Sequence, residues 1–251
     1  MKAAQRELRI QEMVDNQEFV DLETLCRDLG ASESSVRRDL SRLEQQRILK
    51  RVHGGAIAIK TRDHLLDFGW QRARNATEKE RIAALTATLV EDGQTVILDG
   101  GSTTAAVAAR LVNRFLNIIT NSLAIAEVFK NARQIELTLT GGYLYPRLEI
   151  MLGPLCENML AGVTADVLIM GIGGVTEAGF SNNNTLLVGS EQKMIEAARK
   201  VIIVADHTKF GKAAMVHLAP LDIADVVISD TNLSTEHQQM LKSKSIQVLL
   251  A

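Results

Sequence analysis

Apolar residues recur at helical spacing three times within the first 46 residues of the chain. In the third of these segments, Val36, Leu40 and Leu43 fall at positions i, i+4 and i+7 and form one apolar stripe along a helix. Ser32 is a suitable N-cap for this helix, and Gly30 follows the preceding segment as glycine does at helix C-termini. The pattern predicts three short helices, near residues 3–15, 21–29 and 32–46.

Two strand-like runs follow, over residues 49–53 and 56–59, with Gly54 and Gly55 at the turn between them. A glycine pair between two such runs indicates a β-hairpin. Three helices followed by a hairpin are the layout of a winged helix-turn-helix domain, in which the hairpin is the wing. The next segment, residues 60–76, mixes charged residues with isolated apolar ones, and we interpret it as a linker.

Beyond the linker the pattern changes to short apolar runs that are rich in β-branched residues. Most of the gaps between these runs can hold a helix, and this alternation predicts an α/β domain with a mostly parallel sheet and helices on both faces. Thr77 and Glu80 have the spacing of a capping box, which predicts a helix from there to about Val90. The apolar runs are residues 96–98, 118–119, 135–139, 167–170, 201–204 and 226–228. The predicted domains are a winged helix-turn-helix over 1–59, the linker over 60–76 and the α/β domain over 77–251.

Composition and charge narrow the class of protein. Hydrophobic residues make up 46% of the chain and charged residues 23%, which argues for a packed core and against global disorder. The net charge is −2, but residues 31–62 contain eight basic and three acidic residues, a local charge of +5 that is typical of a small nucleic-acid-binding face. Cys26 and Cys156 form no CxxC pair, so we expect reduced thiols in a cytoplasmic protein. The polar N-terminus does not fit a signal peptide, and no apolar run approaches the ~20 residues that span a bilayer, so no membrane association is expected.

The third predicted helix carries Arg and Ser side chains away from its apolar stripe, as a recognition helix in the major groove would. The planar fork of an arginine matches a guanine edge or a phosphate, whereas the alternative is a surface helix with solvated arginines. Basic residues beside the wing turn would contact phosphates or the minor groove, unless the hairpin is merely solvated. We expect Asp39 to orient an arginine or cap locally rather than to contact DNA. The predicted DNA-binding residues are Ser34, Ser35, Arg37, Arg38, Ser41, Arg42, Lys50, Arg51 and His53.

Residues 97–104 read as a strand, a glycine turn, three hydroxyl side chains and the start of a helix. Backbone N–H groups at such a turn favour an anion such as a phosphate, although the segment is neither a Walker P-loop nor GxGxxG. Other glycine or polar turns also follow strands, and ligands of open α/β sheets bind at the carboxyl ends of strands. Ordinary tight turns are the alternative, and for Lys209 a surface salt bridge is the alternative to a phosphate contact. The predicted ligand-binding residues are Asp99, Gly100, Gly101, Ser102, Thr103, Thr104, Thr120, Asn121, Ser122, Gly141, Gly142, Gly171, Gly173, Gly174 and Lys209.

These motifs resemble the DeoR family of regulators in order and spacing over nearly the whole chain. The matching segments are residues 36–40, 49–56, 99–104, 120–122 and 206–211. The resemblance implies a C-terminal domain similar to ribose-5-phosphate isomerase and CoA transferases, a sugar phosphate as ligand, and an oligomer on paired operator sites. The chain departs from the family in its Asn-rich loop, residues 179–184, and at Leu187 and Glu191, where the family often has Glu and Lys. Its phosphate turn reads Gly101-Ser102-Thr103 instead of Gly-Thr-Thr.

Three functions remain open on these grounds. The leading hypothesis is a repressor of a carbohydrate operon, not an enzyme, that binds a double-stranded DNA operator and responds to a small phosphorylated metabolite. The second is a sugar-phosphate isomerase or CoA-transferase-like enzyme with an accessory DNA-binding head, for which Asp99 and Glu191 are the candidate general bases. The third is a constitutive DNA-binding protein. No cofactor or metal site is expected, since no His/Cys cluster has metal-ligand spacing.

Overall fold

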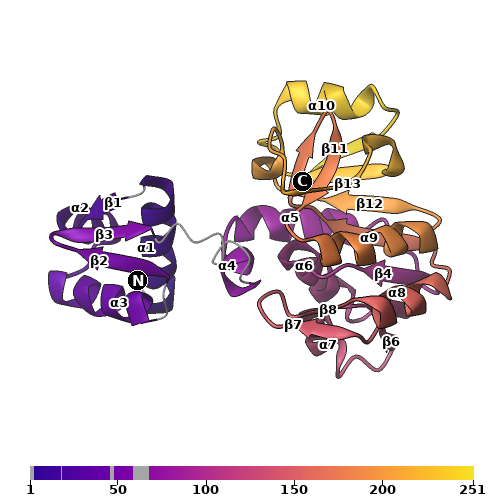
Figure 1. Ribbon diagram of the computed structural model, residues 1–251, viewed down its shortest axis with the longest axis horizontal. Coiled ribbons are helices and arrows are strands. Elements are labelled where there is room, and N and C mark those ends of the chain that lie inside the picture. The colour runs from indigo at the N-terminus through magenta and orange to yellow at the C-terminus, as the bar shows by residue number, and fades with distance from the viewer. Residues whose placement is uncertain (1–2, 18, 46–47, 59–67) are drawn as a thin grey trace. The chain divides into compact units, whose positions relative to one another are not determined.

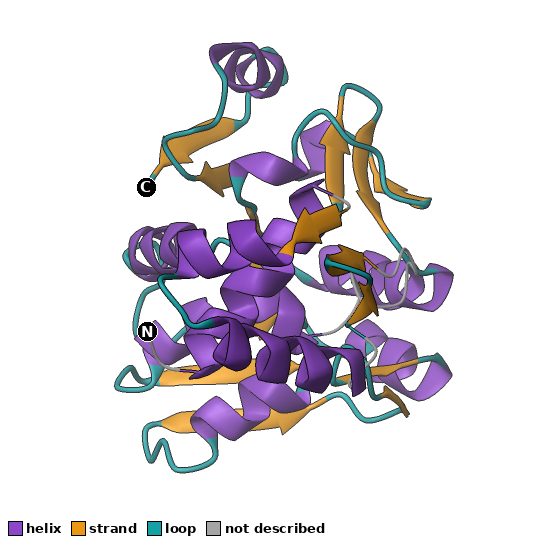
Figure 2. Ribbon diagram, turned by 90° about the vertical axis from the view of Figure 1, so that its left-hand side faces the viewer, coloured by secondary structure: helices purple, strands orange, loops and turns teal. Residues whose placement is uncertain are grey.

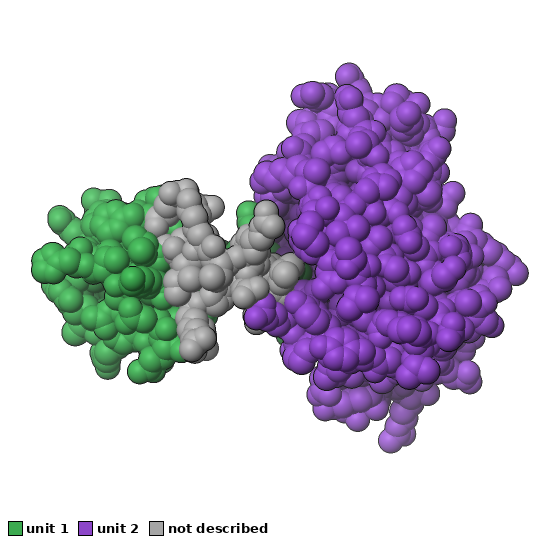
Figure 3. Space-filling view, viewed as in Figure 1, with its two compact units in different colours: residues 1–74 green, residues 75–251 purple. Residues whose placement is uncertain are grey.

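The computed structural model describes residues 3–17, 19–45, 48–58 and 68–251. The chain divides into two compact units, residues 1–74 and 75–251, which are coloured separately in Figure 3. Each unit has its own core of buried apolar side chains.

The N-terminal unit begins with the three predicted helices, α1 (Ala3–Gln17), α2 (Leu22–Leu29) and α3 (Glu33–Gln45) (Figure 1). Asp21 caps α2 by accepting a hydrogen bond from the backbone N–H of Thr24 at 2.7 Å. Gly30 ends α2 in the left-handed conformation, with a φ of 56°. Ser32 directly precedes α3, as predicted for its N-cap. The core of this unit is formed by Ile10, Met13, Val14, Val20, Leu25, Leu29, Val36, Leu40, Leu43, Leu49 and Ala56.

The wing consists of β2 (Leu49–Val52) and β3 (Gly55–Ala58), which pair antiparallel as predicted. A third strand, β1 (Phe19–Asp21), pairs with β3 on its other side. This strand was not predicted, because three residues are too few to show a strand periodicity. The last residue of the predicted second run, Ile59, lies outside the described residues.

The predicted linker contains a helix, α4 (Phe68–Ala73), while its first part, residues 60–67, lies outside the described residues. The capping-box prediction for Thr77 is wrong, because the next helix, α5 (Ala76–Ala87), begins earlier. Its N-cap is Asn75, which has a φ of 51°, and asparagine is one of the few residues that adopt this left-handed conformation readily. Thr77 and Glu80 therefore lie inside the helix rather than before it.

A seven-stranded sheet organises the C-terminal unit, with the strand order β15-β14-β12-β9-β4-β5-β6 and every pair parallel. All six predicted strands are present in it, which confirms the α/β prediction. The seventh, β15, was missed, since it is an edge strand with partly exposed side chains. The strands are β4 (Thr95–Leu98), β5 (Leu116–Thr120), β6 (Ile135–Leu139), β9 (Val167–Gly171), β12 (Val201–Val204), β14 (Val226–Ser229) and β15 (Gln247–Leu250).

Helices cover both faces of this sheet, as the strand pattern predicted. Figure 2 colours the helices purple and the strands orange. Neighbouring side chains along a strand point to opposite faces, so Ile97 joins one core and Val96 and Leu98 join the other. One face packs against α5, α6 (Ser102–Leu111) and α7 (Leu123–Phe129). The other packs against α8 (Pro154–Ala161), α9 (Thr185–Ala197) and α10 (Thr235–Lys242).

Two small antiparallel sheets complete the unit, and neither was predicted from the sequence. One is the hairpin of β7 (Tyr143–Tyr145) and β8 (Ile150–Leu152). The other contains β10 (Gly174–Thr176), β11 (Gly179–Asn182) and β13 (Val216–Ala219). Their strands of three or four residues are too short for a clear alternation of apolar and polar positions.

Candidate functional site

One candidate site is a concavity of about 540 Å³ between α3 and the wing. Because α3 buries Val36, Leu40 and Leu43 in the core, its basic side chains lie on the opposite side of the helix. Four arginines and one serine line the concavity, namely Arg37, Arg38, Ser41, Arg42 and Arg51. All five belong to the predicted DNA-binding set, so the structure brings this part of the prediction together on one surface.

Hydrogen bonds between α3 and β2 fix the position of the wing arginine. Arg51 donates from Nη1 to Ser41 Oγ at 2.5 Å, and its backbone N–H donates to Glu44 Oε1 at 2.9 Å. Ser41 in turn donates to the carbonyl oxygen of Arg37 at 2.9 Å. The Arg37 guanidinium makes an exposed ion pair with Glu33 at 2.6 Å, which is a weak interaction that DNA can replace.

Asp39 is the buried anchor of this surface, with a relative exposure of 0%. It accepts a hydrogen bond from Arg6 Nε at 2.5 Å and another from Arg42 Nη2 at 2.6 Å. The hydrogen bond to Asp39 raises the pKa of the Arg6 guanidinium. Arg42 also pairs with Glu7 at 3.1 Å, so its orientation is set from two sides. This geometry agrees with the predicted orienting function of Asp39.

The other predicted DNA-binding residues lie elsewhere on the unit. Ser34 and Ser35 are at the start of α3, where their hydroxyls lie 3.2 and 3.0 Å from Ser32 Oγ. Lys50 and His53 are exposed on the wing and do not line the concavity. Ser34, Lys50 and His53 are exposed and Ser35 is half-buried, and none of the four lines the concavity.

A second candidate site lies at the carboxyl edge of the large sheet. The strand order reverses between β4 and β9, because the chain proceeds from β4 to β5 and β6 on one side and from β9 to β12 and β14 on the other. Such a switch point is where open α/β sheets bind ligands. Asp99 directly follows β4, and Gly171 ends β9. The turn at Thr120–Ser122 ends the neighbouring strand β5, so the predicted ligand-binding turns share this edge.

Several predicted hydroxyl groups at this edge are occupied by local hydrogen bonds. Thr104 Oγ1 donates to the carbonyl of Gly101 at 2.8 Å, and Thr120 Oγ1 donates to the carbonyl of Leu98 at 2.7 Å. Ser122 caps α7 by accepting from the backbone N–H of Ile125. In contrast, the N-cap residue of α6 is Gly101, which makes no side-chain hydrogen bond to the first turn of the helix. Its first backbone N–H groups are therefore the ones that suit an anion.

Four of the predicted glycines are required by close packing. A Cβ atom on Gly100 would lie 2.2 Å from Ile150 Cγ2, so β8 approaches the phosphate turn closely. A Cβ on Gly173 would lie 2.5 Å from Asn182 Oδ1, which places the Asn182 side chain against the turn after β9. A Cβ on Gly142 or Gly174 would lie 2.5 or 2.3 Å from a backbone carbonyl oxygen. These contacts support the alternative that part of the glycine pattern serves tight turns and packing.

Two buried carboxyl groups dominate the electrostatics of this edge. Burial raises the pKa of Asp99 to about 7, although hydrogen bonds from the backbone N–H groups of Gly100 and Gly171 oppose the shift. Burial also raises the pKa of Glu191 on α9 well above its ordinary value, and the charge of Asp99 raises it further. Asn182 donates a hydrogen bond from Nδ2 to Glu191 Oε1. The Asp99 Oδ1 and Glu191 Oε2 atoms are buried without a hydrogen-bond partner.

Further buried polar groups accompany the two carboxyl groups. Both side-chain polar atoms of Asn121 are buried without a partner, and the buried hydroxyl of Ser190 interacts with the Cys156 thiol. A Cβ on Gly100 would lie 3.2 Å from Asn121 Oδ1, so this amide lies beside the Asp99 turn. We refer to Asp99, Asn121, Ser190 and Glu191 as the polar cluster. Asp99 and Asn121 were predicted as ligand-binding residues, whereas Ser190 and Asn182 were missed, and their one signal was the Asn-rich loop before α9.

Lys209 lies in a short 3₁₀ helix, His207–Lys209, after β12. Since β12 is the neighbour of β9, this segment also follows the carboxyl edge of the sheet. Asp206 caps the 3₁₀ helix by accepting from the backbone N–H of Thr208 at 3.0 Å. The Lys209 side chain is half-buried. Its contact with a ligand stays a prediction.

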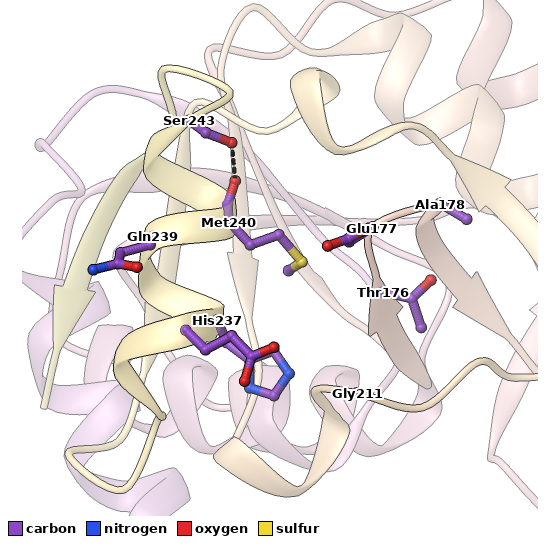
Figure 4. A pocket seen from close by; sticks show the side chains of 9 residues that line it. Thr176, Glu177, Ala178, Gly211, His237, Gln239, Met240 and Ser243 are labelled. Carbon is purple, nitrogen blue, oxygen red and sulfur yellow. Dashed lines mark hydrogen bonds between the residues drawn. The ribbon is translucent and has the colours of Figure 1, made fainter.

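Another concavity, of about 660 Å³, lies between the β10–β11 turn and α10. Figure 4 shows Met240 on α10 pointing toward Glu177 in that turn, and His237 close to Gly211. None of the predicted ligand-binding residues lines it. Its lining residues are Thr176, Glu177, Ala178, Gly211, Glu236, His237, Gln239, Met240 and Ser243.

The described part of the chain contains neither a membrane-spanning helix nor a cluster of metal-binding side chains. No helix there has both the length and the apolar character needed to cross a membrane. In the same residues, no group of three or more His, Cys, Asp and Glu side chains is arranged to hold a metal ion.

Comparisons with known proteins cover the whole chain. A family model described as a DeoR-like helix-turn-helix domain matches residues 6–62, and one described as the DeoR C terminal sensor domain matches residues 74–231. The glycerol-3-phosphate regulon repressor of Escherichia coli (strain K12) is 32% identical over 255 residues, covering 100% of both chains. The HTH-type transcriptional regulator GlpR of Haloferax volcanii is 31% identical over 251 residues, covering 99% of this chain and 98% of its own.

Among solved structures, ribose 5-phosphate isomerase A from Methanocaldococcus jannaschii aligns with 54% of this chain and 55% of its own. The TM-score is 0.41 and the identity 19%, a likeness too weak to carry an argument about function. The full-length relatives are named as transcriptional regulators, so the comparisons do not favour the alternative of an enzyme with an accessory DNA-binding head.

Proposed function

This chain belongs to the DeoR family of transcriptional regulators, and on that premise we propose that it is a repressor whose operator binding is controlled by a small phosphorylated metabolite. The proposed target is an operon of carbohydrate metabolism, and the proposed compartment is the cytoplasm. The names of the relatives support a regulator, and that of the E. coli relative refers to a phosphorylated three-carbon compound, glycerol 3-phosphate.

The observation that carries the DNA-binding proposal is the arginine-lined concavity. Four guanidinium groups and a hydroxyl converge there from α3 and β2. Guanidinium groups bind phosphates and guanine edges through paired N–H donors, and α3 is the helix that would enter the major groove. In this proposal Arg37 and Arg38 contact bases or phosphates directly, while Arg42 and Arg51 are positioned by Asp39 and Ser41. Ser34, Ser35, Lys50 and His53 would extend the contact along the DNA.

The proposed ligand site is the carboxyl edge of the large sheet. The uncapped N-terminus of α6 supports a phosphate position there, since the first N–H groups of a helix and its dipole favour an anion. The predicted ligand-binding residues from Asp99 to Thr104, from Thr120 to Ser122, and at Lys209 all follow strands that end at this edge.

Control of DNA binding requires that the ligand bind one conformation more tightly than the other. By thermodynamic linkage, operator DNA then changes ligand affinity by the same factor as the ligand changes operator affinity. We further propose that residues 1–59 form the DNA-binding domain, 60–76 the linker and 77–251 the sensor. Two or more chains would act together on paired operator sites.

The test is fluorescence anisotropy of the full-length protein on DNA from upstream of its own gene. Titrations are run at two salt concentrations, with and without a mixture of sugar phosphates. The proposal predicts tighter binding than to a random duplex, a salt dependence that reflects phosphate contacts, and a change in affinity when the mixture is present. Tight binding that no sugar phosphate changes would contradict ligand control, and equal binding to random DNA would contradict operator recognition by this segment.

A further inference from the structure

The polar cluster contains hydrogen-bonding groups that the protein itself does not satisfy. Asp99 and Glu191 have relative exposures of 2% and 1%, and Asn121 and Ser190 of 0%. One oxygen of each carboxyl group and both polar atoms of the Asn121 amide have no partner, whereas the Ser190 hydroxyl interacts with the Cys156 thiol. A buried polar group without a partner is costly, and native proteins contain few of them. Four such atoms on neighbouring elements therefore indicate a place for a ligand.

The unsatisfied groups are mostly acceptors. In their ionised form the two free carboxyl oxygens accept hydrogen bonds, as does the Asn121 carbonyl oxygen, while the free amide nitrogen of Asn121 donates. Burial and backbone hydrogen bonds set the pKa of Asp99, while burial, the Asp99 charge and the Asn182 hydrogen bond set that of Glu191. A ligand group that fits this place must bring N–H or O–H donors and, preferably, positive charge.

We propose that the ligand of this regulator carries a protonated amine beside its phosphate, and that Glu191 and Asp99 bind this amine. The class of ligand is an amino sugar phosphate. The inference rests on the proposed function, since the phosphate position at α6 comes from there. Glu191 is the specificity-determining residue, because one of its carboxyl oxygens is buried without a partner and its carboxyl group lies near enough to Asp99 for their charges to interact.

An ammonium group fits the cluster better than a sugar hydroxyl does. A hydroxyl has one donor and no charge, so it leaves at least one of the two free carboxyl oxygens unsatisfied. An ammonium group has three donors, which can serve both carboxyl oxygens and the Asn121 carbonyl. Its charge also compensates the burial of a carboxylate, which is otherwise strongly unfavourable.

The raised pKa values of the two carboxyl groups agree with this assignment. Without a ligand, burial and mutual repulsion favour a proton on the pair near neutral pH. An ammonium group that binds between the carboxyl groups favours their ionised form. Both members of a pair can lose a phosphate proton on binding, because the second pKa of a phosphate is about 6. Binding of the amine is therefore expected to release more protons than binding of the corresponding hydroxyl sugar phosphate.

The experiment measures binding of three matched pairs to the full-length protein by isothermal titration calorimetry. The pairs are the 6-phosphates of glucosamine and glucose, of galactosamine and galactose, and of mannosamine and mannose. We expect the amine to bind about tenfold or more tightly than its hydroxyl counterpart in at least one pair, as a charge-assisted hydrogen bond would give. Titration at pH 6.5 in two buffers of different ionisation enthalpy should show a larger proton release for the amine than for its hydroxyl counterpart.

The decisive variant is Glu191→Gln, which retains the shape of the side chain and removes its charge. It is expected to abolish the preference for the amine and the additional proton release that accompanies it. Glu196→Gln on the same helix is the matched control, because Glu196 is exposed and pairs with Lys193; this variant should keep the preference. Urea unfolding of each variant verifies that its C-terminal unit is folded, and Asp99→Asn provides a second route should Glu191→Gln not fold.

The outcomes separate this inference from the proposed function. Equal or tighter binding of the hydroxyl sugars, or an amine preference that survives in Glu191→Gln, overturns the amine assignment while leaving ligand control intact. Failure of all three amines to bind overturns it as well. If operator binding itself is absent, the proposed function fails, whereas the preference for the amine can still be measured by calorimetry.

Discussion

Two buried carboxyl side chains, Asp39 in the N-terminal unit and Glu191 in the C-terminal unit, are almost equally shielded from solvent but have different surroundings. Asp39 accepts hydrogen bonds from Arg6 and Arg42, and both of its oxygens are used. Glu191 accepts one hydrogen bond, from Asn182, and its second oxygen has no partner. The first carboxylate is paired by the protein itself, whereas the second is left for another molecule to pair.

This difference separates a structural site from a binding site. A paired carboxylate fixes side chains around it, and Asp39 fixes Arg42 at the edge of the arginine-lined concavity. An unpaired carboxyl group lowers stability, and proteins retain such groups where function needs them. The comparison predicts that removing Asp39 destabilises the protein, whereas neutralising the carboxyl groups of the polar cluster stabilises it.

The largest expected effect is on the pH dependence of stability. Burial raises the pKa of Asp99 from 3.8 to about 7, so the folded protein binds a proton that the unfolded chain has lost. The stability that this proton contributes is fully present below pH ~4 and is lost as the pH rises to ~7, a fall of about 4 kcal/mol at ~1.4 kcal/mol per pKa unit. Asp99→Asn should remove most of this fall and be more stable than the wild type at pH 8.

The measurement is urea unfolding of both proteins between pH 5 and 8. Asp92→Asn is the control, because its exposed carboxylate pairs with Arg114 and its pKa is lowered instead. Stability from Asp92 is present above its unfolded pKa and lost only as the pH falls below it, so that variant should keep the wild-type slope. If the free energy of unfolding of the wild type does not fall as the pH rises, Asp99 already has a partner in the protein. The difference between the paired Asp39 and the unpaired carboxyl groups of the polar cluster would then disappear.

The second-largest expected effect is the loss of stability when the paired carboxylate of Asp39 is removed. Asp39→Ala removes the partner of Arg6 and Arg42, and removing one partner of a buried ion pair costs about 3 kcal/mol. The free energy of unfolding, measured in urea, should fall by that amount. Asp28→Ala is the control, since the Asp28–Arg27 pair is exposed and should change stability by less than about 1 kcal/mol. Equal effects of the two substitutions would contradict the anchoring function of Asp39.

A third effect concerns the exposed arginines that the Asp39 network supports. Arg37→Ala combined with Arg38→Ala should weaken operator binding by roughly 100-fold, because an arginine that contacts DNA contributes about 1–3 kcal/mol. Anisotropy titrations at several salt concentrations separate the two kinds of contact. Loss of a base contact relaxes specificity, whereas loss of a phosphate contact reduces the salt slope.

Arg9→Ala serves as the control for the double substitution. Arg9 is an exposed arginine on α1 that pairs with Glu12 and does not line the concavity. Wild-type affinity of the double variant would mean that α3 is not the recognition helix.

The parts of the fold that follow a strong periodicity could be predicted from sequence. The stripe of Val36, Leu40 and Leu43 specified α3, and the β-branched runs specified six strands of the large sheet. The short strands β1, β7 and β10 were missed, since their pairing depends on distant partners rather than on local pattern. The Thr77 cap was wrong because Asn75 begins α5 in a left-handed conformation, which a capping-box pattern does not reveal.

The location of the candidate ligand site could be predicted from the sequence, but the hydrogen bonds within it could not. Parallel strands end at one edge, so the order of strands and turns along the chain is enough to group Asp99 with Asn121. The sequence could not show that Thr104, Thr120 and Ser122 use their hydroxyls in local hydrogen bonds. Nor could it show that Asn182 of the Asn-rich loop donates a hydrogen bond to Glu191 on α9, because these two residues lie on different elements.

The smallest effect tests how the wing is positioned for DNA. Ser41 Oγ accepts a hydrogen bond from Arg51 Nη1, and Ser41→Ala removes that anchor while leaving the arginine in place. A single hydrogen bond contributes about 1 kcal/mol, so operator binding should weaken by roughly fivefold. A double-mutant cycle with Arg51→Ala decides the cause. If Ser41 acts by holding Arg51, its substitution has no further effect once Arg51 is absent. If Ser41→Ala weakens binding equally in the wild type and in Arg51→Ala, the Ser41 hydroxyl contacts DNA itself. The hydrogen bond from Arg51 to Ser41 then does not position Arg51 for DNA binding.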